Sequence, residues 1–170
     1  MSKIKTFPME GIKVFELNRI VDERGSFTEI MRNDWTELFG DEKIQQSNLS
    51  ISYPGMIRAW HRHARGQIDY YVVIKGTVKI CVYDNDKNSK TLGNLTEIIS
   101  SDQKLQVVRV PGHYWHGIKT LGNETSMLVY FINNLYDYEN PDEERSPWNN
   151  SEIIDPQTKL PFDWNKPPHK

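Results

Sequence analysis

The order of apolar and polar residues along the chain is typical of short β-strands. Apolar, β-branched and aromatic residues gather in short runs, and several runs alternate with polar positions, as expected when one strand face is buried. The runs cover 14–17, 28–31, 47–52, 70–74, 78–83, 105–110 and 127–132. Turn-forming residues separate them, among them Lys75-Gly76, Asp84-Asn85-Asp86 and Leu121-Gly122-Asn123. Many short strands at close spacing predict an all-β sandwich or barrel.

One short helix is expected among these strands. Asn33 or Asp34 has the side chain of an N-cap residue, and the sequence that follows suits a helix over 35–39. Gly40 would end this helix, because glycine readily adopts the conformation found after a helix C-terminus.

The C-terminal segment 136–170 has a different composition from the rest. It is rich in Pro, Asp, Glu, Asn and Trp and has little periodicity, which predicts an irregular wrap packed on the barrel. The length fits a single domain over residues 1–170. We expect N-terminal strands and the short helix in 1–50, the barrel core in 51–135, and the wrap in 136–170.

Composition narrows the function classes. The 21 basic and 23 acidic residues give a formal charge of −2, so no basic excess suggests nucleic acid or an anionic membrane as a partner. No apolar stretch approaches the roughly 20 residues of a membrane helix, and the first residues do not resemble a signal peptide. The single cysteine, Cys81, lies in a strand-like run and is expected to be a buried apolar residue. A cytoplasmic protein is predicted.

Three histidines are the candidates for chemistry. His61 and His63 form a His-x-His pair, and side chains two residues apart on a strand share one face. His116 follows a Pro-Gly turn later in the chain and could converge on the same interior. Gln67 and Asp69 come shortly after the pair. Histidine with a carboxylate is a plausible set of ligands for a first-row metal.

Beyond these residues, the motifs resemble a known family. The His pair between Gly55 and Gly76, with a Pro-x4-His later, resembles the double-stranded β-helix (jelly-roll) barrels called cupins. A more specific pattern runs over roughly residues 14–150 and is similar to the dTDP-4-dehydrorhamnose 3,5-epimerase family. Its parts are 22–29 (DERGSFTE), 46–50 (QSNLS), 55–61 (GMIRAWH), Gly76, 111–117 (PGHYWHG), Tyr130, 136–138 (YDY), 140–141 (NP) and Trp148.

The resemblance implies a cupin-fold homodimer that epimerises a nucleotide-linked 4-keto-6-deoxy sugar without a cofactor, in deoxysugar and polysaccharide biosynthesis. His61 would remove the proton next to the C4 ketone, and Tyr130 would return a proton on the opposite face. The nucleotide and pyrophosphate would be held, partly across the dimer, by Arg24, Phe27, Glu29, Gln46, Asn48 and Arg58. The remaining substrate-binding candidates are His63, Asp69, His116 and Tyr136.

Three departures from the family pattern bear on the reaction. Asp69 stands where the family usually has a lysine, which would stabilise an enolate. His63 stands where the family usually has glutamine. The family's catalytic histidine is commonly paired with an aspartate, for which Asp163 is a weak candidate. A further difficulty is Arg58, which alternates in phase with Trp60 on its strand and not with His61.

Two alternatives to a cofactor-free epimerase therefore stay open. The first is a metal-dependent cupin enzyme, an oxygenase or isomerase, in which His61, His63, Asp69 or Gln67, and His116 bind a divalent first-row metal. The second is a protein that binds the nucleotide sugar without turning it over. The motifs assigned to the nucleotide favour a nucleotide-sugar substrate, because a general metal cupin does not need them.

Overall fold

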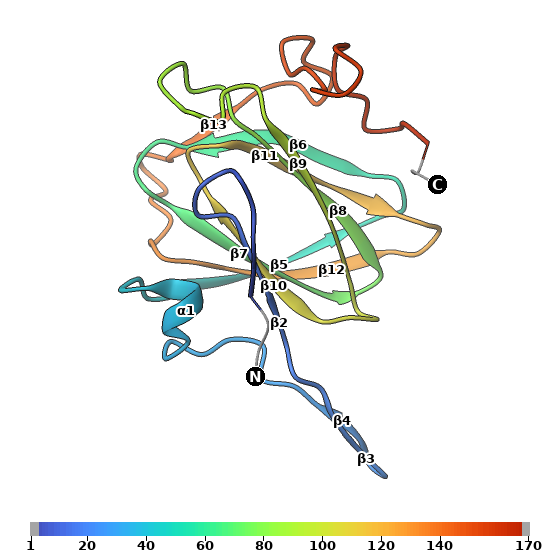
Figure 1. Cartoon of the computed structure of the whole chain (residues 1–170). Helices are drawn as coiled ribbons and strands as arrows, with labels where there is room; N and C mark the ends of the chain where they lie inside the picture. The colour runs from blue at the N-terminus through green and yellow to red at the C-terminus, as the bar shows by residue number, and fades with distance from the viewer. Residues whose placement is uncertain (1–3, 168–170) are drawn as a thin grey trace.

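The computed structural model describes residues 4–167 and shows two antiparallel β-sheets packed face to face (Figure 1). The larger sheet has six strands in the order β1-β2-β10-β7-β12-β5, and the smaller has five in the order β13-β6-β11-β8-β9. A separate two-stranded hairpin, β3-β4, projects from the barrel. The prediction of an all-β jelly-roll barrel is confirmed.

The strands of the larger sheet are β1 (Ile4–Thr6), β2 (Lys13–Glu16), β5 (Gln46–Ser52), β7 (Ile68–Lys75), β10 (Gln106–Pro111) and β12 (Ser126–Ile132). Those of the smaller sheet are β6 (Ile57–His63), β8 (Thr77–Tyr83), β9 (Leu95–Ser101), β11 (Trp115–Leu121) and β13 (Glu143–Arg145). The hairpin consists of β3 (Ile20–Asp22) and β4 (Gly25–Phe27). The predicted runs do not include the short strands β1, β3 and β4. They also miss β9 and β11, where apolar positions are interrupted by polar ones.

The barrel interior is filled by apolar side chains from both sheets. Val73 of β7 and Val108 of β10 meet Ile80 of β8 and Ile118 of β11 in one buried cluster. Burial of such side chains, worth about 25 cal/mol per Å² of apolar surface, is the main force that holds the sheets together. The polar pocket described below occupies the part of the interior that this cluster leaves unfilled.

Parts of the outer faces of both sheets are also covered, and this explains the continuous apolar run of β7. Tyr70 and Val72 on the outer face of β7 pack with Leu38 and Phe39 of α1 (Thr36–Phe39), so β7 is buried on both sides. The outer face of the smaller sheet packs against the C-terminal segment, where the ring centroids of Trp60 and Trp164 lie 4.8 Å apart. Cys81 is buried there, as predicted.

Two local predictions in the N-terminal part are wrong. Residues 28–31 do not form a strand, because the β3-β4 hairpin already ends at Phe27. The helix begins after Trp35, and no side chain caps it. Asn33 instead accepts a hydrogen bond from the Ile44 backbone N–H at 3.1 Å, and Asp34 forms an ion pair with Arg32.

The end of the same helix is as predicted. Gly40 has φ 64°, and its backbone N–H donates to the Thr36 carbonyl at 2.8 Å. A positive φ of this kind is easily adopted by glycine and costly for most other residues.

The C-terminal segment contains more order than its composition indicates. Glu143–Arg145 forms β13, which pairs with His61–His63 of β6 at the edge of the smaller sheet. The prediction of an irregular wrap is therefore wrong for this stretch, which borders the pocket. Within residues 4–167, no helix is long and apolar enough to cross a membrane.

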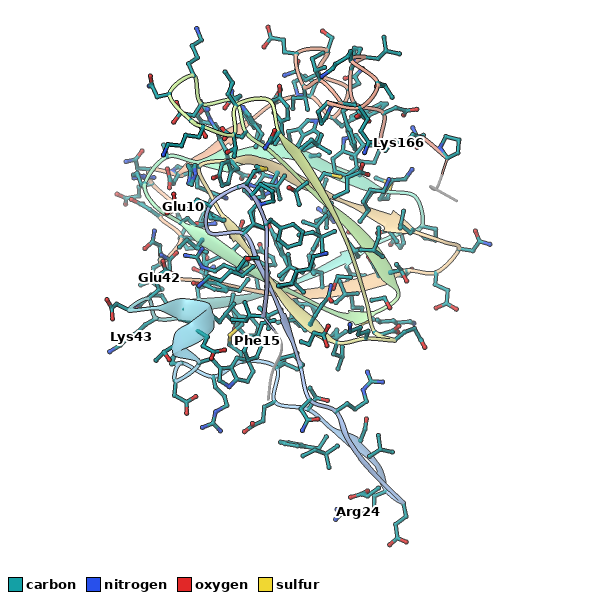
Figure 2. All side chains as sticks on the ribbon, viewed as in Figure 1. Glu10, Phe15, Arg24, Glu42, Lys43 and Lys166 are labelled. Atoms are coloured by element: carbon teal, nitrogen blue, oxygen red, sulfur yellow. The ribbon has the colours of Figure 1, made fainter. Side chains whose placement is uncertain are left out.

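The β3-β4 hairpin stands apart from the packed barrel. Arg24 lies at its tip, well away from both sheets (Figure 2). Ile20, Val21 and Phe27 on this hairpin are 56%, 71% and 62% exposed, which is unusual for large apolar side chains gathered in one short element.

Candidate active site

A pocket of about 600 Å³ opens between the two sheets. Its floor and walls come from β5, β7 and β12 of the larger sheet and from β6, β11 and β13 of the smaller one. The lining is mixed, with Leu128 and Ile132 beside polar groups such as Asn48 and Tyr130. A cavity of this size with a few convergent polar groups is typical of a small-molecule site.

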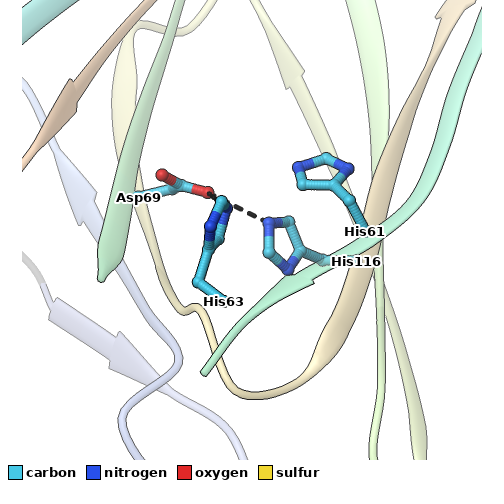
Figure 3. Close-up of side chains that lie close together, drawn as sticks. All are labelled: His61, His63, Asp69 and His116. Atoms are coloured by element: carbon cyan, nitrogen blue, oxygen red, sulfur yellow. Dashed lines mark hydrogen bonds and ion pairs between the residues drawn. The ribbon is translucent and has the colours of Figure 1, made fainter. Parts of the chain in front are cut away.

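Three histidines and one aspartate meet at one end of this pocket (Figure 3). His61, His63 and Asp69 line the pocket, whereas His116 is fully buried behind them and does not line it as expected. His61 and His63 lie on β6, and His116 of β11 pairs in register with His61. Asp69 reaches the same point from β7 in the opposite sheet. One ligand atom of each of the four side chains lies within 4.8 Å of the others. The convergence of His116 with the His-x-His pair is as predicted.

Backbone carbonyls fix the orientation of two of the imidazoles. His116 Nδ1 lies 2.8 Å from the Tyr114 carbonyl, and His63 Nδ1 lies 3.1 Å from the Asp142 carbonyl. Because a carbonyl only accepts, each Nδ1 carries the proton and each Nε2 is turned toward Asp69. The distances from Asp69 Oδ2 are 3.0 Å to His116 Nε2 and 3.8 Å to His63 Nε2.

Asp69 is held by two further donors. The Tyr71 hydroxyl donates to Oδ2 at 2.9 Å, and the Gln67 amide donates to Oδ1 at 2.9 Å. Burial by itself raises the pKa of Asp69, but the hydrogen bond with His116 and the nearby histidines outweigh it and lower this pKa to about 2. Asp69 is therefore a carboxylate at neutral pH, although only 2% of it is exposed.

His61 differs from the other two histidines. Within the described part of the chain, neither of its ring nitrogens has a hydrogen-bond partner, and its ring lies 4.2 Å from that of His116. Burial lowers the pKa of His61 well below 6.5, and His116 lowers it further. The ring is thus neutral at physiological pH, with a lone pair that no neighbour occupies.

Tyr130 faces the same pocket from the opposite sheet, on β12. Burial raises the pKa of Tyr130 above 10.0, and Asp69 and Glu143 raise it further. Its hydroxyl therefore keeps its proton at neutral pH. The sheet that carries Tyr130 faces the sheet that carries His61, so the two side chains flank the pocket from its two walls.

Gln46, Asn48 and Tyr136, expected to hold substrate, also line the pocket. Gln46 links them, because its amide donates to Asn48 Oδ1 at 2.8 Å and its carbonyl oxygen accepts from the Tyr136 backbone N–H at 2.9 Å. These three residues thus form one hydrogen-bonded polar group on the pocket wall, called the polar platform below.

Arg58 lines the pocket as well, despite its phase in the sequence. The pairing of β6 with β11 shifts register, so that His116 pairs with His61 and Ile118 pairs with Arg58. This bulge adds one residue to β6 and moves Arg58 to the other face of the strand. Arg58 then donates to Ser52 Oγ at 2.9 Å.

Arg24, Phe27 and Glu29 are not brought to this pocket. Arg24 forms an ion pair with Asp22 on the hairpin, and Glu29 pairs with Arg32 at 2.7 Å. None of the three lines the pocket of their own chain. Their expected contact with the nucleotide stays a prediction, and it requires a second subunit.

Asp163, the weak candidate for a partner of His61, lies elsewhere and accepts a hydrogen bond from the Asn165 backbone N–H at 2.8 Å. The buried carboxylate of the cluster is Asp69.

Sequence reasoning missed Asp142, whose carboxylate accepts from the backbone N–H groups of Ala64 and Arg65 while its carbonyl orients His63. It also missed Tyr71. A buried tyrosine two residues from an aspartate on one strand was the available signal.

The two packed sheets and the polar pocket between them define a cupin-type barrel. Comparison with known proteins identifies the family of cupin-type proteins to which the chain belongs. The sequence profile described as dTDP-4-dehydrorhamnose 3,5-epimerase matches residues 6–159. The chain belongs to this family and is therefore an enzyme of the epimerase class of isomerases.

Relatives agree with this assignment. The chain is 43% identical, over 82% of its length and 88% of the relative, to the probable low-salt glycan biosynthesis epimerase Agl13 of Haloferax volcanii. It is 32% identical, over 92% of its length and 97% of the relative, to the spore coat polysaccharide biosynthesis protein SpsL of Bacillus subtilis.

A solved structure gives the same result. The dTDP-4-dehydrorhamnose 3,5-epimerase of Bacillus anthracis, crystallised with TDP and PPi bound, superposes with a TM-score of 0.81 at 25% identity. The match covers 92% of this chain and 90% of that one.

Proposed function

We propose that the protein epimerises a nucleotide-linked 4-keto-6-deoxy sugar of the dTDP-4-dehydro-6-deoxyglucose type. The observation that carries the proposal is the placement of His61 and Tyr130. A half-buried neutral imidazole without a hydrogen-bond partner among the described residues and a protonated phenol flank one pocket from facing sheets. Inversion of a carbon centre needs a base on one side and an acid on the other.

In the proposed reaction, His61 removes the proton from the carbon next to the C4 ketone. The electron pair of the broken C–H bond moves into a C=C bond, and the ketone oxygen becomes an enolate. Tyr130 then donates its proton to the opposite face of the same carbon, which restores the ketone and inverts the centre. His61 is left protonated and Tyr130 ionised, and exchange with water resets both. The reaction moves only protons, so it needs no electron carrier.

The nucleotide half of the substrate would lie along the polar platform. Gln46, Asn48 and Arg58 supply amide and guanidinium groups at the pocket wall, and guanidinium groups suit pyrophosphate oxygens. Tyr136 offers a ring for stacking.

We further propose a homodimer in which Arg24, Phe27 and Glu29 of one subunit reach the partner's pocket. The exposed apolar side chains of the β3-β4 hairpin support this arrangement. The names of Agl13 and SpsL support a role in glycan or polysaccharide synthesis.

Solvent deuterium exchange tests the reaction directly. The protein is incubated in D2O with dTDP-4-keto-6-deoxyglucose, and the sugar is followed by NMR and mass spectrometry. We expect deuterium at C3, or at C3 and C5, together with the inverted product. Binding of dTDP without any exchange would contradict the proposal and indicate a protein that only binds the nucleotide sugar.

A further inference from the structure

We propose that His63, Asp69 and His116 bind a divalent first-row transition metal ion, with His61 left free beside it. The proposal starts from the contact between His116 and Asp69, which is a hydrogen bond only when His116 carries a proton on both ring nitrogens. His116 Nδ1 is committed to the Tyr114 carbonyl, so a neutral ring presents a bare lone pair from Nε2. That lone pair would face Asp69 Oδ2, another acceptor, at 3.0 Å. Two acceptors at this distance require a proton or a cation between them.

The geometry fits a metal ion. Metal–nitrogen and metal–oxygen bonds of about 2.0–2.2 Å place neighbouring ligand atoms roughly 3.0–3.5 Å apart in common coordination geometries. The separations of Asp69 Oδ2 from His116 Nε2 and His63 Nε2 are 3.0 Å and 3.8 Å. The candidate ligand atoms all lie within 4.8 Å of one another, so side-chain movements of about 1 Å would bring the three atoms onto one ion.

The surroundings of these ligands are those of a metal site. In metal centres, a ligating histidine commonly donates its other N–H to a carbonyl or carboxylate, and a ligating carboxylate is itself hydrogen-bonded. His63 and His116 both donate Nδ1–H to carbonyls, and Asp69 accepts from Tyr71 and Gln67. Metal binding would replace the 3.1 Å hydrogen bond from the Gln67 amide to His63 Nε2 and leave the other contacts in place.

The set of ligands selects the class of ion. Two imidazoles and one carboxylate with open positions suit iron(II), cobalt, nickel or zinc, whereas magnesium prefers a shell of oxygen ligands. His61 is not included among the metal ligands. Within residues 4–167, its ring has no hydrogen bond to a backbone carbonyl of the kind that orients His63 and His116.

The charge of the pocket gives such an ion a role, and this role rests on the proposed function. An enolate forming beside the buried Asp69 carboxylate would be repelled by it. Arg58 and Arg145 are the cationic side chains among the described lining residues, and each already donates to neighbouring oxygens. A divalent ion on Asp69 would reverse the sign of this region and polarise the C4 ketone while His61 removes the proton.

Direct metal binding is the first test. Protein freed of metals with a chelator is titrated with Co²⁺, followed by visible absorption, and with Zn²⁺, followed by calorimetry. We expect one ion per chain with a Kd below about 10 µM, and no heat with Mg²⁺. Absence of both signals for wild-type protein at about 100 µM ion would overturn the proposal and leave Asp69 and His116 as a simple ion pair.

Variants then define the ligands. Asp69→Asn and His63→Gln keep shape close to the original, and each should weaken Co²⁺ binding about 100-fold or more. His113→Ala is the matched control, because His113 is an exposed histidine near the same strand and should change Kd less than about twofold. His61→Asn should behave like this control. An equal loss in His61→Asn would overturn the three-ligand set, since His61 would then be a ligand and unavailable as the base.

Deuterium exchange separates this inference from the proposed reaction. Exchange that rises at least about tenfold when Co²⁺ or Zn²⁺ is returned to metal-free protein supports the role in enolate stabilisation. Full exchange in metal-free protein would overturn that role while the epimerase proposal stands. No exchange with or without metal would contradict the epimerase proposal and leave the binding result intact.

Discussion

The wall of the pocket and the β3-β4 hairpin carry residues of the same family pattern, but those on the wall are packed inside the barrel and those on the hairpin are exposed. His61, His63, Asp69 and His116 come from three strands of one barrel, and hydrogen bonds fix His63, Asp69 and His116 in place. The hairpin carries Arg24 and Phe27 into solvent, away from both sheets.

This difference between the pocket wall and the hairpin shows which part of the site one chain can form by itself. The cluster needs side chains fixed to within a fraction of an ångström, and paired strands of a packed barrel provide this rigidity. A two-stranded hairpin has too little buried surface to be rigid by itself. Its apolar side chains gain stability only against another surface, so we expect that a second subunit completes the nucleotide end of the pocket.

The largest effect is expected from His61→Asn, which removes the base but keeps a polar side chain of similar shape. The rate of deuterium exchange should fall by about 10²–10⁴-fold, the usual contribution of a general base. The Kd for dTDP, measured by calorimetry, should stay within about twofold, because the nucleotide binds elsewhere in the pocket. Exchange at the wild-type rate would remove His61 as the base.

A pair of stability variants compares the barrel with the hairpin. Trp164→Ala should lower the free energy of unfolding by about 3–5 kcal/mol, because Trp164 is buried against Trp60 and its loss leaves a cavity. Val21→Ser on the hairpin should change it by less than about 0.5 kcal/mol in the monomer. Urea unfolding at low protein concentration measures both. A large loss for Val21→Ser would show that the hairpin packs more tightly than its exposure indicates.

Tyr130→Phe distinguishes the role of the acid on one wall of the pocket from that of the base on the other. The inverted product should form about 10²-fold more slowly, because the acid on that face is missing. Deuterium exchange on the His61 face should continue, since the base and the enolate are unaffected. NMR of one reaction mixture reports both rates. Tyr138→Phe, a change at an exposed tyrosine on the pocket rim, is the control. Parallel loss of exchange and inversion would contradict the assignment of Tyr130 as the acid.

Mixing two impaired variants tests whether the hairpin of one subunit completes the pocket of its partner. In a dimer with shared pockets, His61→Asn and Arg24→Ala subunits complement each other, because one pocket of the mixed dimer keeps both residues. Random pairing gives half mixed dimers, each with one intact pocket of two, so about one quarter of the wild-type kcat/KM should return after refolding together. No recovery above the separate variants would place Arg24 in the pocket of its own chain or outside the site.

Much of the barrel could be predicted from local sequence. The runs of β12 and β8 are apolar because both faces of these strands are covered, and turn residues mark their ends. The helix start could not be predicted, because Asn33 and Asp34 are good caps that instead bind Ile44 and Arg32. The strand β13 could not be predicted from its acidic sequence either, since an edge strand needs only backbone pairing and little apolar character.

The shared face of His61 and His63 follows from local sequence, because side chains alternate along a strand whatever surrounds it. The all-β class and the family pattern follow from the sequence as well. That Asp69 and His116 meet this pair depends on the tertiary structure, since these residues lie on strands whose pairing involves the whole barrel. The same holds for the bulge that turns Arg58 into the pocket and for the hairpin that holds Arg24 outside it. Strand pairing between distant segments, which local residue preferences do not encode, is the physical reason.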